Sequence, residues 1–164
     1  MAAPPTHAGQ PYLPVPRAAR RLRDGTEHVM SHELVFYDGH CGLCHHSIRF
    51  LLARDRDGAL FRYAPLFGET FEAQVPDEAR EGLADSLVVL RYDGVLLQRA
   101  SGVFQLLWRL GGFWGVVGMV GSWLPSRLTD WGYDRVAEVR HQLFKRPAES
   151  CPLVPEELRS RFLP

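Results

Sequence analysis

The feature that most constrains the fold is a pair of cysteines, Cys41 and Cys44, placed where a short apolar run gives way to a helical pattern. The run covers residues 34–37 and is short, apolar and aromatic, as a strand buried on both faces should be. Asp38-Gly39 follows it and is typical of a turn. From Cys44 onward, apolar residues recur at helical spacing. The sequence therefore predicts a thiol pair where a buried strand meets the start of a helix.

This placement has a consequence for the chemistry of the two thiols. The first backbone N–H groups of a helix are unpaired and carry partial positive charge, which stabilises a thiolate on Cys41. Cys44 shares the apolar helix face, so we expect Cys44 to be buried and Cys41, one turn earlier, to be exposed. Cys41 would then attack in disulfide exchange and Cys44 would resolve the mixed disulfide. Asp38 is either a proton relay for Cys44 or simply a turn former.

The next segments predict a parallel strand pair. Residues 60–64 read as a second strand, so strand, helix and strand form a right-handed crossover. Residues 69–83 are polar and partly helical, and Pro76 divides them. We expect a short helix, a break, and a second helical turn that starts near Pro76.

A hairpin and a helix complete the predicted core. Residues 86–91 and 95–99 are apolar runs on either side of Asp93-Gly94, which is a strong hairpin signal. Ser101 is expected to be the N-cap of the following helix. The order of elements is βαβαββα, which predicts an α/β, thioredoxin-like fold with the cysteine pair after its first strand.

The two ends of the chain differ in character from this core, which we assign to residues 31–111. Residues 1–30 are rich in proline and arginine and predict a disordered tail, with an organelle presequence as the alternative. We expect residues 112–164 to form a helical C-terminal extension packed on the core, with a helix over 128–144. Within it, residues 112–124 are apolar but shorter than the about 20 residues that span a bilayer. They either pack on the core or contact a membrane surface or a partner.

Composition narrows the class of protein. The chain has 164 residues, with 19 lysines plus arginines and 19 aspartates plus glutamates, so its balanced charge argues against a general nucleic-acid binder. It contains 3 cysteines, too few for a disulfide-stapled secreted domain, and Cys151 is left over when the other two pair. Redox or metal use of the pair in the cytoplasm is the better interpretation.

The segment from Tyr37 to Cys44 resembles the DCC family of thiol-disulfide oxidoreductases, named for an Asp-x-x-Cys-x-x-Cys signature that Asp38, Cys41 and Cys44 match position by position. The resemblance extends over roughly residues 33–154. It implies a thioredoxin-like fold and a dithiol–disulfide couple that exchanges with protein or small-molecule thiols, without an organic cofactor or a metal. The other matching segments are Tyr63-Ala64-Pro65-Leu66, Asp85-Ser86, Asp93-Gly94 with Ser101, Tyr133-Asp134-Arg135-Val136-Ala137 with Arg140, and Cys151-Pro152-Leu153.

One position departs from the thioredoxin relatives. Those proteins carry a cis-proline immediately before the third core strand, facing the cysteines. Here Asp85-Ser86 occupies that place, and the nearest upstream proline is Pro76. Asp85 or Ser86 is therefore expected to face the sulfur pair.

Two other functions fit the same residues. The first is a zinc site, for which the cysteine pair supplies two of the four ligands of a structural site. The second is a non-catalytic partner-binding module that uses residues 112–124. Further candidate zinc ligands are Cys151, His40, His45 and His46, although solvent-facing positions also suit His45 and His46.

Overall fold

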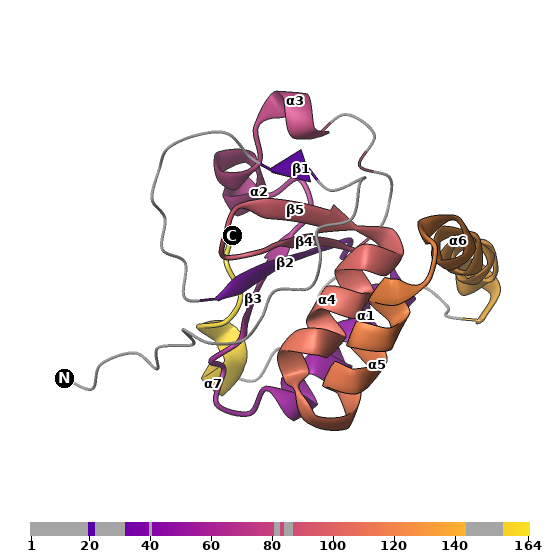
Figure 1. Cartoon of the computed structure of the whole chain (residues 1–164). Coiled ribbons are helices and arrows are strands. Elements are labelled where there is room, and N and C mark those ends of the chain that lie inside the picture. The colour runs from indigo at the N-terminus through magenta and orange to yellow at the C-terminus, as the bar shows by residue number, and fades with distance from the viewer. Residues whose placement is uncertain (1–19, 22–31, 40, 81–82, 84–86, 144–155) are drawn as a thin grey trace.

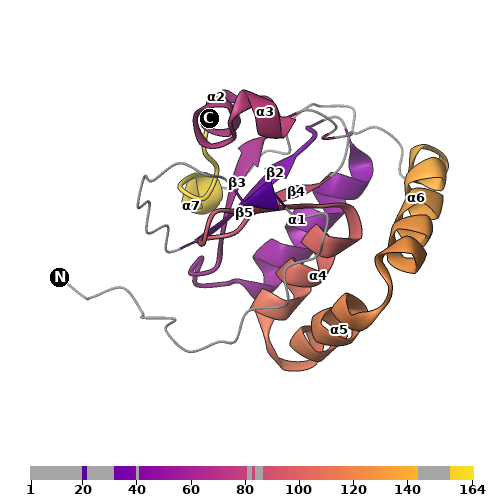
Figure 2. The ribbon, with the colours of Figure 1, turned by 45° about the horizontal axis from the view of Figure 1, so that its top comes forward.

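The structure, a computed structural model, places a mixed β-sheet between two layers of helices (Figure 1). Helices α1 and α4 lie on one face of the sheet, and α2 with α3 lies on the other (Figure 2). The residues that the structure describes are 20–21, 32–39, 41–80, 83, 87–143 and 156–164.

The sheet has five strands in the order β1-β5-β4-β2-β3. The pair β2 and β3, at one end of this order, is parallel, and the other pairings are antiparallel. Strands β2 to β5 thus have the predicted thioredoxin-like arrangement, which confirms the α/β fold class. The bounds are Arg20–Arg21 for β1, Glu33–Tyr37 for β2, Phe61–Pro65 for β3, Val88–Leu90 for β4 and Val95–Gln98 for β5.

Strand β2 is buried on both faces, as its apolar run predicts. Val35 and Tyr37 join the core beneath α1 (Gly42–Arg54) and α4 (Arg99–Leu110). Leu34 and Phe36 alternate with them and join the core beneath the other helices. This strand therefore carries the chain through the middle of the molecule and delivers it to the start of α1.

The opposite face is covered by two short helices, α2 (Glu69–Gln74) and α3 (Asp77–Arg80). Phe71 of α2 packs edge-on against Phe36, with ring centroids 5.0 Å apart. The two helices are separated at Val75 and Pro76, which confirms the predicted break. Proline has no backbone N–H and therefore starts a helical turn more readily than it continues one.

The start of α4 differs from the expectation that Ser101 is its N-cap. The helix begins at Arg99, and Gln98 is the N-cap. The Ser101 hydroxyl donates to the Gln98 carbonyl at 2.6 Å, so it satisfies an acceptor and caps no N–H group. The prediction failed because the chain turns directly from β5 into the helix, with Arg99 in the left-handed region at φ 55°.

The C-terminal part of the described chain adds two long helices, α5 (Gly112–Trp123) and α6 (Ser126–Leu143). Helix α5 packs against α4 and not against the sheet (Figure 1). Gly118 permits this close approach, because a Cβ there would lie 2.5 Å from the Phe104 carbonyl oxygen. At Gly121 a Cβ would lie 2.3 Å from the Phe104 ring. Helix α6 contacts α4 and α1.

The last residues return to the sheet, which the sequence did not indicate. After the short helix α7 (Glu156–Arg159), the chain pairs with the outer edge of β3. The Tyr63 N–H donates to the Arg161 carbonyl, and the Leu163 N–H donates to the Tyr63 carbonyl, both at 2.8 Å. Phe162 stacks on the Tyr63 ring at a centroid distance of 5.1 Å.

The opposite edge of the sheet is occupied by β1, whose two residues pair with Val95 and Leu96 of β5. The sequence also gave no sign of this strand. Residues 1–19 and 22–31 lie outside the described residues, so the disordered tail stays a prediction.

Candidate active site

The cysteine pair lies where the sequence places it, between the end of β2 and the start of α1. Cys41 is the N-cap of α1 and has an extended backbone with φ −93° and ψ 111°. Its N–H donates to the Asp38 carbonyl at 3.2 Å, which closes a turn of four residues. The Asp38-Gly39 turn thus brings Cys41 back onto the helix axis directly after the buried strand.

The two sulfurs are in contact. Both cysteines are free thiols, and the Cys44 thiol is hydrogen-bonded to Cys41. This hydrogen bond, followed by burial and by the charge of Cys41, holds the pKa of the Cys44 thiol far above its ordinary value. The Cys44 thiol is therefore held in its protonated form. The arrangement suits a protonated resolving thiol behind an attacking sulfur.

Cys41 is more enclosed than the sequence suggested. The exposed fraction is 5% for Cys41 and 6% for Cys44, so the predicted burial of Cys44 is confirmed and the predicted exposure of Cys41 is wrong. Cys41 is the N-cap, and its hydrogen bond with the buried Cys44 thiol turns its side chain inward. Both side chains join the core that contains Tyr37 and Leu87. Little of either cysteine is therefore open to solvent.

Asp38 is next to the buried thiol. Its backbone N–H is hydrogen-bonded to the Cys44 sulfur, which lowers the Cys44 pKa, and its carboxylate raises that pKa by charge. The structure thus brings the predicted residues Asp38, Cys41 and Cys44 together around one pair of sulfur atoms. Their catalytic roles remain predictions.

The histidines of α1 differ in environment. His46 is exposed, whereas His45 is half-buried and its Nε2 lies 3.1 Å from the Gly39 carbonyl oxygen. Sequence reasoning treated the two alike because neighbouring residues on a helix give no sign of which one reaches back to the preceding loop. Four other predicted candidates lie outside the described residues, namely His40, Asp85, Ser86 and Cys151.

The zinc alternative finds no ligand set in the part of the chain that the structure describes. Within those residues, no group of three or more His, Cys, Asp or Glu side chains is placed to hold a metal ion. The cysteine pair alone supplies two ligands, fewer than the four that a structural zinc site takes.

The comparisons with known proteins agree with this geometry. Residues 35–146 match the family of DCC1-like thiol-disulfide oxidoreductases. The chain belongs to this family. The resemblance seen in the signature Asp38-x-x-Cys41-x-x-Cys44 is thereby confirmed.

A relative that aligns over most of this chain is also found. "Uncharacterized protein YuxK" of Bacillus subtilis (strain 168) is 27% identical over 143 residues, which cover 85% of this chain and 99% of that protein. No solved structure matches the chain significantly. Membership in the DCC1-like family supports a thiol-disulfide oxidoreductase role and implies thiol-containing substrates.

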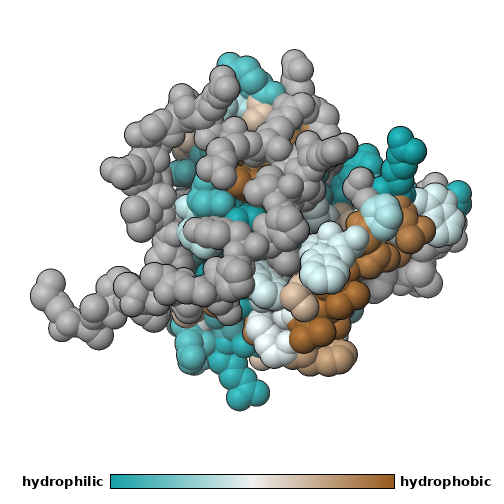
Figure 3. Space-filling view, viewed as in Figure 1, coloured by the Kyte–Doolittle hydropathy of each residue, from teal (hydrophilic) through white to brown (hydrophobic). Residues whose placement is uncertain are grey.

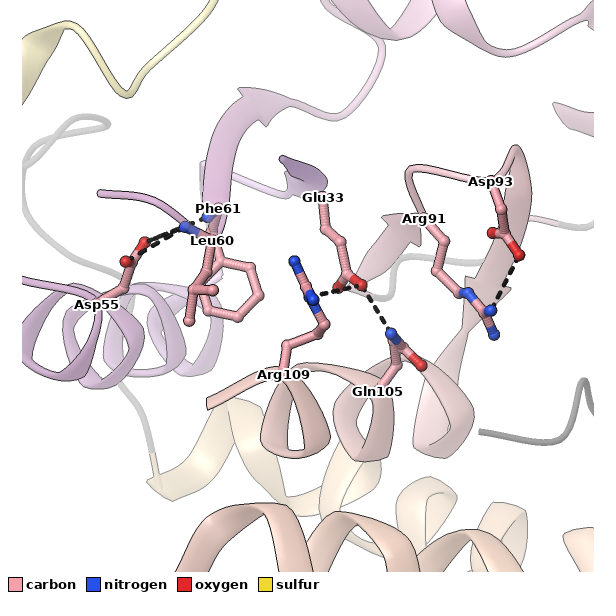
Figure 4. Close-up of polar contacts among 8 residues, drawn as sticks. All are labelled: Glu33, Asp55, Leu60, Phe61, Arg91, Asp93, Gln105 and Arg109. Atoms are coloured by element: carbon pink, nitrogen blue, oxygen red, sulfur yellow. Dashed lines mark hydrogen bonds and ion pairs between the residues drawn. The ribbon is translucent and has the colours of Figure 1, made fainter. Parts of the chain in front are cut away.

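A second polar cluster lies at the other end of β2, and sequence reasoning missed it (Figure 4). Glu33, at the start of that strand, is fully buried. Its Oε1 accepts from Gln105 Nε2 at 2.7 Å and lies 3.2 Å from Arg109 Nε. Burial raises the pKa of Glu33 to about 7, although the positive charge of Arg109 opposes that rise. The DCC1-like match begins at residue 35 and does not include Glu33.

Proposed function

We propose that this protein is a thiol-disulfide oxidoreductase that shuttles two electrons between its Cys41–Cys44 pair and a partner dithiol. The observation that carries this proposal is the hydrogen-bonded contact between the two sulfurs at the start of α1. Membership in the DCC1-like family points to the same chemistry. The partner is a protein or a small molecule with a disulfide, and the reaction takes place in the cytoplasm.

The exchange has two steps. In the first, the Cys41 thiolate attacks one sulfur of the partner disulfide, which forms a mixed disulfide and releases the partner's other sulfur as a thiolate. In the second, Cys44 loses its proton and attacks the Cys41 sulfur, which forms the Cys41–Cys44 disulfide and releases the second partner thiolate. The partner gains two electrons, and the reverse sequence oxidises a partner dithiol.

Asp38 is proposed to accept the Cys44 proton in the second step. The pKa of Cys44 is raised by its hydrogen bond to Cys41 and by burial, so the thiol needs a nearby base at the moment it attacks. The Asp38 carboxylate is close enough to act on the Cys44 pKa through its charge. Asp38→Asn would retain the turn and remove the base.

The test is mass spectrometry of thiol alkylation before and after reduction, resolved by cysteine. The wild-type protein should show a two-electron couple confined to Cys41 and Cys44. Cys41→Ser should abolish exchange, and Cys44→Ser should accumulate mixed disulfides on Cys41. Cys151→Ser is the matched control and should leave the couple intact. Independent alkylation of Cys41 and Cys44 with no disulfide between them, together with no trapped adduct, would contradict the proposal.

We infer a second role from the outer surface of α5, which we propose contacts a membrane surface. An exposed apolar stripe runs along this helix (Figure 3), and its members follow at helical spacing. Helix α5 carries no charged residue, and its inner face is already covered by α4. Tryptophan and phenylalanine at such a surface suit the interface between lipid and water. The stripe consists of Phe113 (73% exposed), Val116 (55%), Val120 (53%) and Trp123 (77%).

This contact would lie on the surface, since no helix among the described residues has the length and apolarity to cross a membrane. Co-sedimentation with phosphatidylcholine–phosphatidylglycerol vesicles tests it. Trp123→Ser should weaken binding, whereas Phe67→Ser, which changes a 59% exposed ring outside α5, should not. Wild-type protein that stays in the supernatant would remove this role and leave the redox proposal standing.

A further inference from the structure

His45 connects the two sides of the thiol site. Its backbone N–H donates to the Cys41 carbonyl at 3.2 Å. Its ring Nε2 lies 3.1 Å from the carbonyl oxygen of Gly39, six residues earlier in the chain. A carbonyl oxygen only accepts hydrogen bonds, so Nε2 must carry the proton in this contact. One residue of α1 therefore binds both the attacking cysteine and the loop that leads to it.

Backbone hydrogen bonds also hold the segment between β2 and α1. The Cys41 N–H bond to the Asp38 carbonyl closes it at one point. The N-cap position of α1 has no side-chain hydrogen bond to the helix N-terminus, because a cysteine occupies it. Gly39 lies within the loop, and glycine has more backbone freedom than other residues. A side chain that holds the Gly39 carbonyl therefore restrains the chain at a flexible residue between Asp38 and Cys41.

The position of that segment matters for the sulfur pair. Asp38 supplies the backbone N–H that is hydrogen-bonded to Cys44, and Cys41 supplies the other sulfur, so both ends of the loop belong to the reacting group. A shift of the Gly39 peptide would change the separation of the two sulfurs and the direction of the Asp38 N–H. Misplacement of reacting atoms by about 1 Å costs as much as about 100-fold in rate.

We propose that His45 is a positioning residue for thiol–disulfide exchange. Its Nε2–H holds the Gly39 carbonyl and thereby keeps the Cys41 sulfur against Cys44. This inference rests on the proposed exchange reaction and adds to it a residue outside the Asp-x-x-Cys-x-x-Cys signature. In this role His45 acts through the loop and is not itself a reacting group.

The experiment compares two variants of similar length at one position. His45→Gln keeps an amide N–H at about the reach of Nε2, whereas His45→Met fills the same space without a donor. His46→Met is the control on the exposed side of the same helix. The readouts are the rate of exchange with oxidised glutathione, the reduction potential of the Cys41–Cys44 couple, and the urea unfolding midpoint of each variant.

We expect the three variants to differ in exchange rate by more than their urea unfolding midpoints explain. His45→Met should lose about tenfold in exchange rate and shift the potential, because the loop is released. His45→Gln should restore the rate to within about twofold of wild type, as His46→Met should, because each retains a donor to Gly39. An equal loss in His45→Gln and His45→Met would overturn the proposal, because the donor would not be what matters.

A measurement on the wild-type protein keeps the test decisive if a variant does not fold. Nitrogen NMR of the His45 ring should show the proton on Nε2, and a neutral ring protonated only at Nδ1 would overturn the inference. A His45→Met variant that exchanges at the wild-type rate would also overturn the inference, and the redox function would stand. A wild-type protein without any Cys41–Cys44 couple would overturn the proposed function itself and this role with it.

Discussion

Glu33 offers a prediction whose magnitude follows from the structure. Its carboxyl is fully buried, and burial raises its pKa from 4.5 to about 7. The folded protein therefore binds a proton on Glu33 between about pH 4.5 and 7, where the unfolded chain has lost it. Stability must fall as pH rises through this window, because the native state binds more protons than the unfolded state does.

The size of the fall is set by the two pKa values. Their difference is about 2.5 pH units, and at about 1.36 kcal/mol per unit this gives about 3 kcal/mol. The contribution is complete below pH 4.5 and is lost by about pH 7. Glu33→Gln carries no titrating proton and retains an oxygen that can accept from Gln105 Nε2, so its stability should change less with pH than that of the wild type.

The assay is urea unfolding at a series of pH values between 4 and 8. The free energy of unfolding at the high-pH end of the series, minus that at the low-pH end, should be about 3 kcal/mol more negative in the wild type than in Glu33→Gln. Glu72→Gln is the control, because Glu72 is an exposed carboxylate on α2. Parallel profiles for wild type and Glu33→Gln would refute the reasoning, since burial of Glu33 would then not govern its protonation.

Three further predictions concern packing and thiol reactivity. Gly118→Ala should destabilise the fold by about 1–3 kcal/mol in urea unfolding, because its Cβ would meet a backbone oxygen of α4 at 2.5 Å, whereas Gly132→Ala, with nothing within 4 Å, should not. Phe162→Ala should cost about 1–3 kcal/mol in thermal or urea unfolding through loss of its stacking on Tyr63; no change would show that this contact contributes nothing. Cys44 should react with iodoacetamide more slowly than Cys41 at every pH up to 9, because its pKa is raised; equal labelling rates by mass spectrometry would contradict that.

Local patterns were enough to predict the elements that hold the site. The run that became β2 is apolar on both faces, and Asp38-Gly39 and Asp93-Gly94 are turn signals whose chemistry is contained in two residues. The helical spacing after Cys44 placed α1 and its inward face. These signals depend only on neighbouring residues in the sequence, so they can be read without knowledge of the tertiary structure.

The features that were missed depend on contacts between distant residues. The enclosure of Cys41 follows from how α1 seats on the sheet, which the helical pattern alone does not give. Glu33 reads as a polar residue before a strand, and only the packing of α4 across it shows a buried charge pair with Arg109. The His45 ring reaches back to the Gly39 carbonyl, and the turn before Cys41 brings that carbonyl within reach. Each of these is decided by tertiary geometry, which overrides local preference.

The pairing of residues 161–163 with β3 affects the tendency of this protein to self-associate through its sheet edge. An uncovered outer strand presents a row of N–H and C=O groups on which another chain can nucleate a shared sheet. Here one border of the sheet ends in the two-residue β1 and the other is shielded by the segment around Phe162. Deleting residues 160–164 would bare β3 along its length, and the shortened protein should then precipitate at concentrations where the intact one stays dispersed.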